Sequence, residues 1–227
     1  HIANMKEISV VRLIGVYDID TKKGKSVSFN YNVKHFKSLN DMLKEVDAVS
    51  IVVPTSFHYE VAKEALSAGK HVFIEKPITS KLVEAEKLIE LSEKKGLKIQ
   101  VGHIERFNPA FLSLKDIELK PMFIESHRLA RFNPRGLDVS VVLDLMIHDI
   151  DLILYMVKSP VKKIEASGVN VVSNSIDIAN SRIQFENGAV ANVTSSRISQ
   201  KNMRKMRIFQ RNDYITIDFL NKKAEIY

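Results

Sequence analysis

The protein has 227 residues, no cysteine and a formal net charge of +7 at pH 7. This length suits one large domain or two small ones, and the lack of cysteine excludes disulfides and cysteine-based metal sites while fitting a reducing cytoplasm. No apolar run approaches membrane-spanning length and no signal peptide is apparent, so we expect a cytoplasmic protein without a membrane partner.

The basic residues are scattered and often stand beside glutamate, as in "EKLIELSEKKG" at 86–96. Such mixed charge is typical of solvated helix faces, whereas a nucleic-acid groove needs a clustered basic stripe. We therefore expect no nucleic-acid partner. The mild positive bias still suits an anionic small-molecule substrate.

Strands and helices alternate from the start of the chain to residue 103. Residues 1–8 read as the last turns of a helix. The expected strands are 12–17, 33–36, 48–54, 71–75 and 98–103, and the expected helices are 38–46, 58–70 and 80–96. The run "AVSIVVP" at 48–54 is β-branched without alternation, as in a strand covered on both faces. The alternation predicts a parallel, doubly wound sheet.

The rhythm changes after residue 104. Residues 106–117 look helical, 122–132 look like a long strand, and the almost wholly apolar run 139–157 predicts a buried helix. From 161 onward the chain is mostly strands, with hairpin turns expected at "ENG" (186–188) and "RND" (211–213). This half predicts a mostly antiparallel sheet with a helix on one face. We expect two domains, residues 1–104 and residues 105–227.

Asp144 and His148 are spaced i and i+4 on the apolar helix and would share one face. Polar groups in a buried helix need partners. A carboxylate beside a histidine fixes the tautomer of the imidazole, and histidine suits a general acid or base near neutral pH. A structural Asp–His pair explains the spacing equally well, and two side chains are too few to indicate a metal site.

Lys76 closes the apolar run "HVFIEKPI" at 71–78. Pro77 disfavours a helical conformation at Lys76, so its ammonium should leave the carboxyl end of a parallel strand, where open α/β folds bind ligands. Glu75 is a possible partner for the ammonium. A surface ion pair is the alternative explanation.

Asp18 also follows an expected strand. In dinucleotide-binding folds an acid at such a place receives the ribose hydroxyls. A simple turn residue in "YDID" is the competing interpretation, which the lack of a Gly-rich loop in this sequence favours.

Together these segments resemble the glucose–fructose oxidoreductase/inositol dehydrogenase (Gfo/Idh/MocA) family over nearly the whole chain. The resemblance rests on "VVPTSFHYEVAKEALSAGKHVFIEKPI" at 52–78, "VVLDLMIHDIDL" at 141–152 and "DIANSRIQFENGAVANVTSSR" at 177–197. More narrowly, "VGHIERFNPAF" at 101–111 is similar to the branch that contains UDP-N-acetylglucosamine 3-dehydrogenases.

The resemblance implies an oxidoreductase that moves a hydride between NAD, with NADP as an option, and a hydroxyl-bearing carbon of a sugar or UDP-sugar. It implies catalytic roles for Lys76, His148 and Asp144, with the proton acceptor being either of the first two. The remaining implied residues are Asp18, Pro54, Thr55, His58 and Glu75 for the cofactor, with Lys76 beside it, and Arg106, Asn108, Arg131 and Arg135 for the substrate.

Two features depart from the family pattern. A first strand and Gly-rich loop are expected before His1, and Met146 stands where many relatives carry glycine, which narrows the expected pocket. A homodimer or homotetramer is expected through the open sheet face, with Val190, Val193, Ile208 and Phe209 exposed on it.

Two alternatives remain at this stage. One is a reductase of the same fold acting on an inositol or a dihydrodiol. The other is a non-catalytic dinucleotide sensor or scaffold.

Overall fold

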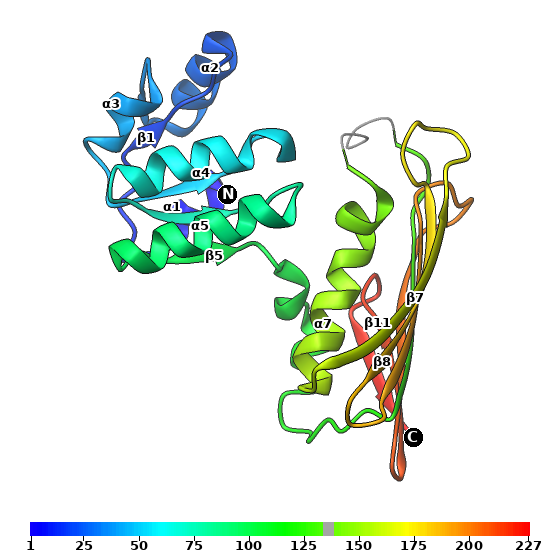
Figure 1. Cartoon of the computed structure of the whole chain (residues 1–227). Coiled ribbons are helices and arrows are strands. Elements are labelled where there is room, and N and C mark those ends of the chain that lie inside the picture. Colours follow the sequence, from blue (N-terminus) through cyan, green and yellow to red (C-terminus); the bar gives the residue numbers. More distant parts are fainter. Residues whose placement is uncertain (134–138) are drawn as a thin grey trace. The chain divides into compact units, whose positions relative to one another are not determined.

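The computed structural model describes residues 1–133 and 139–227 (Figure 1). The chain divides into two compact units, His1–Gly102 and His103–Tyr227, close to the boundary expected after residue 104. Within the described residues, no helix is long and apolar enough to cross a membrane.

The first unit contains parallel strands in two groups. β1 (Gly15–Val16) pairs with β2 (Lys34–His35), and β4 (His71–Ile74) lies between β3 (Ala48–Ile51) and β5 (Ile99–Val101). The helices are α1 (Ile2–Glu7), α2 (Thr21–Tyr31), α3 (Leu39–Leu43), α4 (His58–Ser67) and α5 (Leu82–Lys95), with a short 3₁₀ turn, η1 (Thr55–Phe57), before α4. The predicted parallel, doubly wound architecture is confirmed.

The core of the first unit lies between α4 and α5 and the strands β3 to β5. Its innermost side chains include Leu66 and Ile74, both wholly buried. Both helices end where glycine adopts a positive φ, at Gly69 (77°) and Gly96 (64°). Glycine has no Cβ, so it takes the left-handed conformation that ends an α-helix without a steric penalty.

Helix α2 occupies a polar stretch in which no helix was expected. Asp20 caps it, since its carboxylate accepts the backbone N–H of Lys22 and of Lys23 at 3.0 and 3.2 Å. The helix ends at Asn32, which is left-handed with φ 48°. Its residues are mostly exposed, so no apolar stripe marks it, and the capping aspartate is the only strong signal.

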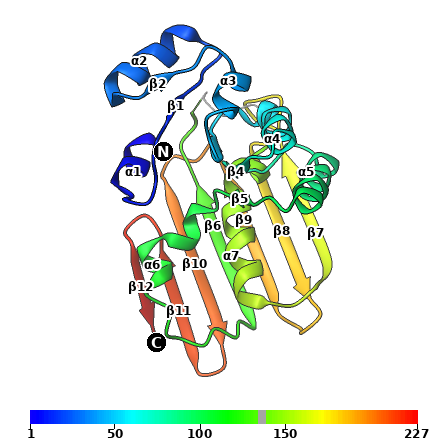
Figure 2. The same cartoon turned by 90° about the vertical axis from the view of Figure 1, so that its left-hand side faces the viewer.

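The second unit is built on a seven-stranded sheet, visible face-on in Figure 2. Its strand order is β12-β11-β10-β6-β9-β8-β7, and only the central pair β6–β9 is parallel. The strands are β6 (Phe123–Leu129), β7 (Val161–Val169), β8 (Ile178–Phe185), β9 (Val190–Ser196), β10 (Met203–Gln210), β11 (Asp213–Asp218) and β12 (Lys223–Ile226). Both predicted hairpin turns are confirmed, between β8 and β9 and between β10 and β11.

One face of this sheet is covered by the predicted apolar helix, which is formed in two parts. A π-helical turn, η3 (Val142–Met146), leads into α7 (Ile147–Val157). The helix expected at 106–117 is instead a 3₁₀ turn, η2 (Ile104–Phe107), followed by α6 (Pro109–Leu112). It breaks at Asn108, which is extended because the next residue is proline.

The expectation that Val193 and Ile208 lie on the open sheet face is wrong, because both are wholly buried in the hydrophobic core of the second unit. Successive strand residues point to opposite faces. Val190 and Val193 are three residues apart and Ile208 adjoins Phe209, so neither pair can share a face. Phe209 does lie on the outer face, where it stacks on Tyr214 with ring centroids 4.8 Å apart.

Candidate functional site

The predicted cofactor residues Asp18, Pro54, Thr55 and Lys76 follow the ends of strands in the first unit. Asp18 follows β1, Pro54 and Thr55 follow β3, and Lys76 follows β4. Because β3 and β4 are adjacent and parallel, their carboxyl ends meet at one edge of the sheet. This edge is where open α/β sheets bind ligands.

The carboxylate of Glu75 is held against the backbone at this edge. One oxygen accepts the N–H of Lys76 at 3.2 Å, and the other lies 2.7 Å from Nε2 of His1. The Lys76–Pro77 peptide bond is cis. Glu75 therefore contacts the backbone of Lys76.

Gly102, directly after β5, makes room for this carboxylate. A Cβ at position 102 would lie 3.0 to 3.2 Å from the carboxyl atoms of Glu75, closer than ordinary van der Waals contact. Glu75 must therefore move if position 102 carries a side chain.

We expect Gly102→Ala to lower kcat severalfold by displacing Glu75 from the N–H of Lys76, while thermal stability changes little. Steady-state kinetics and thermal denaturation test this. Gly96→Ala is a suitable control. Its positive φ of 64° means that alanine lowers stability there, but an added Cβ meets no atom within 4 Å. An unchanged kcat in Gly102→Ala would contradict a role for Glu75 in holding the backbone of Lys76.

Two of the predicted cofactor residues differ in exposure. Thr55 is buried and begins η1, while Pro54 before it is exposed. Asp18 is exposed, and one of its carboxylate oxygens accepts the N–H of Asp20 at 2.8 Å, as a turn residue does. An exposed carboxylate at a strand end keeps its second oxygen available for a ligand.

His58, the first residue of α4, is 1% exposed. Its two ring nitrogens lie within hydrogen-bonding distance of two backbone carbonyl oxygens, those of Val53 and Pro77. Its polar atoms therefore contact the protein, and the predicted contact with the nicotinamide stays a prediction.

In the second unit Asp144 lies in the π-helical turn η3, and His148 is the second residue of α7. Both are partly buried. π-Helical turns are rare and are frequent at functional sites. Because this turn departs from α-helical geometry, the side-chain contact expected from the i, i+4 spacing stays a prediction.

Beside His148, Asp149 is buried and bonded to Arg128 of β6. Arg128 donates to both carboxylate oxygens of Asp149 at 2.9 Å and to Glu105 of η2 at 3.2 Å. Arg128 is 2% exposed and Asp149 1%. This bidentate pair fixes α7 on the sheet.

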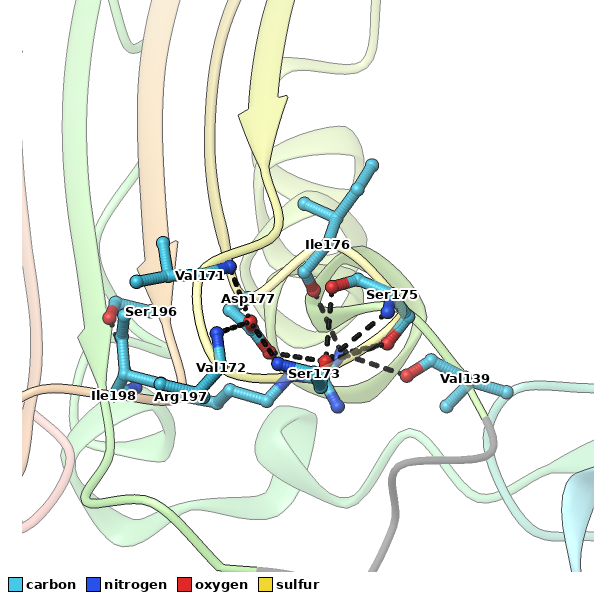
Figure 3. Close-up of polar contacts among 10 residues, drawn as sticks. All are labelled: Val139, Val171, Val172, Ser173, Ser175, Ile176, Asp177, Ser196, Arg197 and Ile198. Carbon is cyan, nitrogen blue, oxygen red and sulfur yellow. Dashed lines mark hydrogen bonds and ion pairs between the residues drawn. The ribbon is translucent and has the colours of Figure 1, made fainter.

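A second polar cluster holds the chain that leads into η3 (Figure 3). Arg197 donates to the carbonyl oxygens of Val139 and Ile176 at 2.8 and 2.9 Å, and lies 3.6 Å from Asp177. The hydroxyl of Ser173 and three backbone N–H groups hold the pKa of Asp177 well below its usual range. The approach to Asp144 is therefore anchored to the loop before β8.

The predicted substrate residues all have protein partners where the structure describes them. Arg106 makes a bidentate pair with Asp151, and its Nε lies 2.7 Å from a carboxylate oxygen of Asp151. Asn108 caps α6 and donates to Glu105 and to the carbonyl of Phe219. Arg131 donates to the carbonyl of Gln200 at 2.9 Å. Arg135 lies outside the described residues, and the substrate roles stay predictions.

Sequence reasoning missed the Arg128–Asp149 pair and the Arg197–Asp177 cluster. The apolar helix carried a usable signal, because a second carboxylate at Asp149 on a buried helix requires a cationic partner. The partner itself, on a strand 21 residues away, follows only from the fold.

The chain is similar to known proteins over both units. The "Oxidoreductase family, NAD-binding Rossmann fold" of Gfo/Idh/MocA matches residues 1–103, and the C-terminal domain of the same family matches residues 119–215. UDP-N-acetylglucosamine 3-dehydrogenase of Acidithiobacillus ferrooxidans is 40% identical over 98% of this chain, which spans 71% of that enzyme.

A solved structure of that enzyme superposes with a TM-score of 0.92 at 40% identity, covering 96% of this chain and 73% of the other. The NAD⁺-dependent scyllo-inositol 2-dehydrogenase of Bacillus subtilis is 30% identical over 68% of this chain, which spans 49% of that protein. Because both units match the family's two domains in order, this chain belongs to the Gfo/Idh/MocA family of oxidoreductases with an NAD-binding Rossmann fold.

Proposed function

We propose that this protein oxidises a hydroxyl group on the sugar of a UDP-sugar, with UDP-N-acetylglucosamine as the first candidate. The observation that carries the proposal is the 40% identity, over 98% of the chain, with a UDP-N-acetylglucosamine 3-dehydrogenase. The retained Lys76, Asp144 and His148 support a catalytic protein over a dinucleotide sensor.

The residues fit a bound NAD. Asp18 offers an exposed carboxylate to ribose hydroxyls at the end of β1, and Lys76 follows the end of β4. When bound, NAD accepts the hydride.

The chain's own residues then handle the proton. His148 or Lys76 accepts it from the substrate hydroxyl, the ammonium of Lys76 stabilises the developing alkoxide, and Asp144 orients the imidazole.

The test is a spectrophotometric assay of NAD reduction by the complete natural protein with a panel of UDP-sugars, scyllo-inositol and myo-inositol. We expect turnover with UDP-N-acetylglucosamine at a kcat/KM at least tenfold above that for either inositol. Faster turnover of an inositol would establish the alternative substrate class. Dinucleotide binding without turnover of any member would favour a sensor.

Asp18 predicts the choice of cofactor. Its carboxylate accepts ribose hydroxyls but repels a 2′-phosphate, so NAD should bind at least tenfold more tightly than NADP. Asp18→Asn should narrow this ratio, because the amide lacks the negative charge. Calorimetry with both dinucleotides measures it, and NADP binding as tight as NAD contradicts the assignment of Asp18.

The proposed assembly is a homo-oligomer formed through the outer face of the C-terminal sheet. This face carries an aromatic row in which Tyr214 stacks between Phe209 and Tyr227. The ion pair of Arg207 with Glu125 lies beside it. Sedimentation velocity distinguishes a dimer or tetramer from a monomer. The cytoplasmic location likewise remains part of this proposal.

A further inference from the structure

His58 is a buried polar side chain between two loops of the first unit. It begins α4, directly after η1, and is 1% exposed. A buried imidazole needs hydrogen-bond partners to offset its desolvation.

The partners of His58 are both backbone carbonyl oxygens. Nδ1 lies 2.8 Å from the oxygen of Pro77, and Nε2 lies 3.0 Å from the oxygen of Val53. Carbonyl oxygens only accept, so a neutral imidazole donates to one of them and an imidazolium to both. The ring therefore joins the loop after β3 to the loop after β4.

The two carbonyl oxygens depend to different degrees on their hydrogen bond with His58. Pro77 is buried, so its carbonyl oxygen depends on a protein donor, whereas Val53 is 37% exposed. Pro77 also directly follows Lys76. On the N-terminal side of Lys76, the backbone N–H of Lys76 donates to a carboxylate oxygen of Glu75 at 3.2 Å. The backbone of Lys76 is therefore held from both sides, by Glu75 before it and by His58 after it.

We propose that His58 is a positioning residue for Lys76, acting through the bond from Nδ1 to the carbonyl of Pro77. This inference rests on the proposed catalytic role of Lys76. It assigns His58 to the backbone that carries the ammonium, in place of a direct contact with the cofactor.

Asparagine and glutamine separate the two bonds of the ring. The amide nitrogen of asparagine takes about the place of Nδ1, and that of glutamine about the place of Nε2. We expect His58→Asn to keep kcat within about threefold of the wild type. His58→Gln and His58→Ala should lower kcat about ten- to a hundredfold, as small misplacements of a catalytic group do.

The Kd for NAD should change less than threefold in all three variants. A merely structural histidine predicts equal losses for asparagine and glutamine, in parallel with the loss of thermal stability. A glutamine variant as active as the asparagine variant would overturn the proposal.

A readout without cofactor follows from the same geometry. In ¹H–¹⁵N spectra of the protein alone, the backbone amide signal of Lys76 should move in His58→Gln and stay near its place in His58→Asn. The same displacement in both variants would contradict the assigned bond.

A double-mutant cycle separates this proposal from the proposed function. If His58 acts through Lys76, adding His58→Ala to Lys76→Ala should cause no further loss of kcat. Additive losses would show that His58 acts elsewhere. Lys76→Ala with normal turnover would instead refute the catalytic role of Lys76, whatever the His58 variants do.

Discussion

Replacing His148 with alanine should lower kcat by about a hundred- to ten-thousand-fold, the usual cost of losing a positioned acid–base group. Lys76→Ala should lose turnover on a similar scale, because the developing alkoxide loses its nearby positive charge. Stopped-flow and steady-state measurements with NAD and UDP-N-acetylglucosamine test both. The Kd for NAD should remain nearly unchanged, since neither side chain is assigned to the pyrophosphate or the adenosine.

Asp144→Asn serves as the graded comparison. It keeps a hydrogen-bonding group at position 144 but removes the charge proposed to support the imidazole of His148, so its loss of kcat should be smaller than that of His148→Ala. Lys158→Ala, at an exposed residue directly after α7, is a matched control and should leave kcat unchanged. His148→Ala with normal turnover would return Asp144 and His148 to a structural role.

Arg128→Ala should destabilise the second unit by about 3–5 kcal/mol, because it leaves the buried carboxylate of Asp149 without its cationic partner. Urea denaturation measures this change. Replacing both partners together, as Arg128→Met with Asp149→Leu, should recover most of the loss, since the buried carboxylate of Asp149 is then gone and Glu105 keeps Arg204 as a cationic partner at 3.5 Å.

The control for this effect is an exposed ion pair. Lys163 and Glu165 lie 2.8 Å apart on the edge strand β7 with both side chains more than half exposed. Lys163→Ala should change the free energy of unfolding by less than about 1 kcal/mol. An equally small effect of Arg128→Ala would contradict the role of the buried pair.

The alternation of apolar runs and helical periods was sufficient to predict the fold class of both units. Local chemistry was decisive at several points, as at Gly69, where the helix stop was expected, and at "ENG" and "RND", where the hairpins turn. α2 was missed because its side chains are mostly exposed, so its sequence lacks the apolar period that predicts a helix.

The candidate site was less predictable than the fold. Lys76 could be assigned to a strand end from its own neighbours, but the partners of His58 are a residue five positions back and one nineteen positions on. Hydrogen bonds to backbone carbonyls leave no trace in side-chain patterns. The pairing of Arg128 with Asp149 likewise depends on which strand lies under α7.

The π-helical turn at Asp144 was also beyond sequence reasoning. A π turn and an α turn carry the same apolar residues, and only the hydrogen-bond register distinguishes them. The misassigned sheet face, in contrast, could have been avoided from the sequence alone. The two-residue period of a strand already excludes a shared face for Val190 and Val193.

We propose that Lys76, from the first unit, and His148, from the second, act on one substrate hydroxyl. A crystal structure of the complete protein with NAD and UDP-N-acetylglucosamine tests it most directly. We predict that the ammonium of Lys76 and a ring nitrogen of His148 both lie within about 2.6–3.2 Å of the same sugar hydroxyl, with the nicotinamide beside it. A complex in which either group is remote from the sugar would contradict the account.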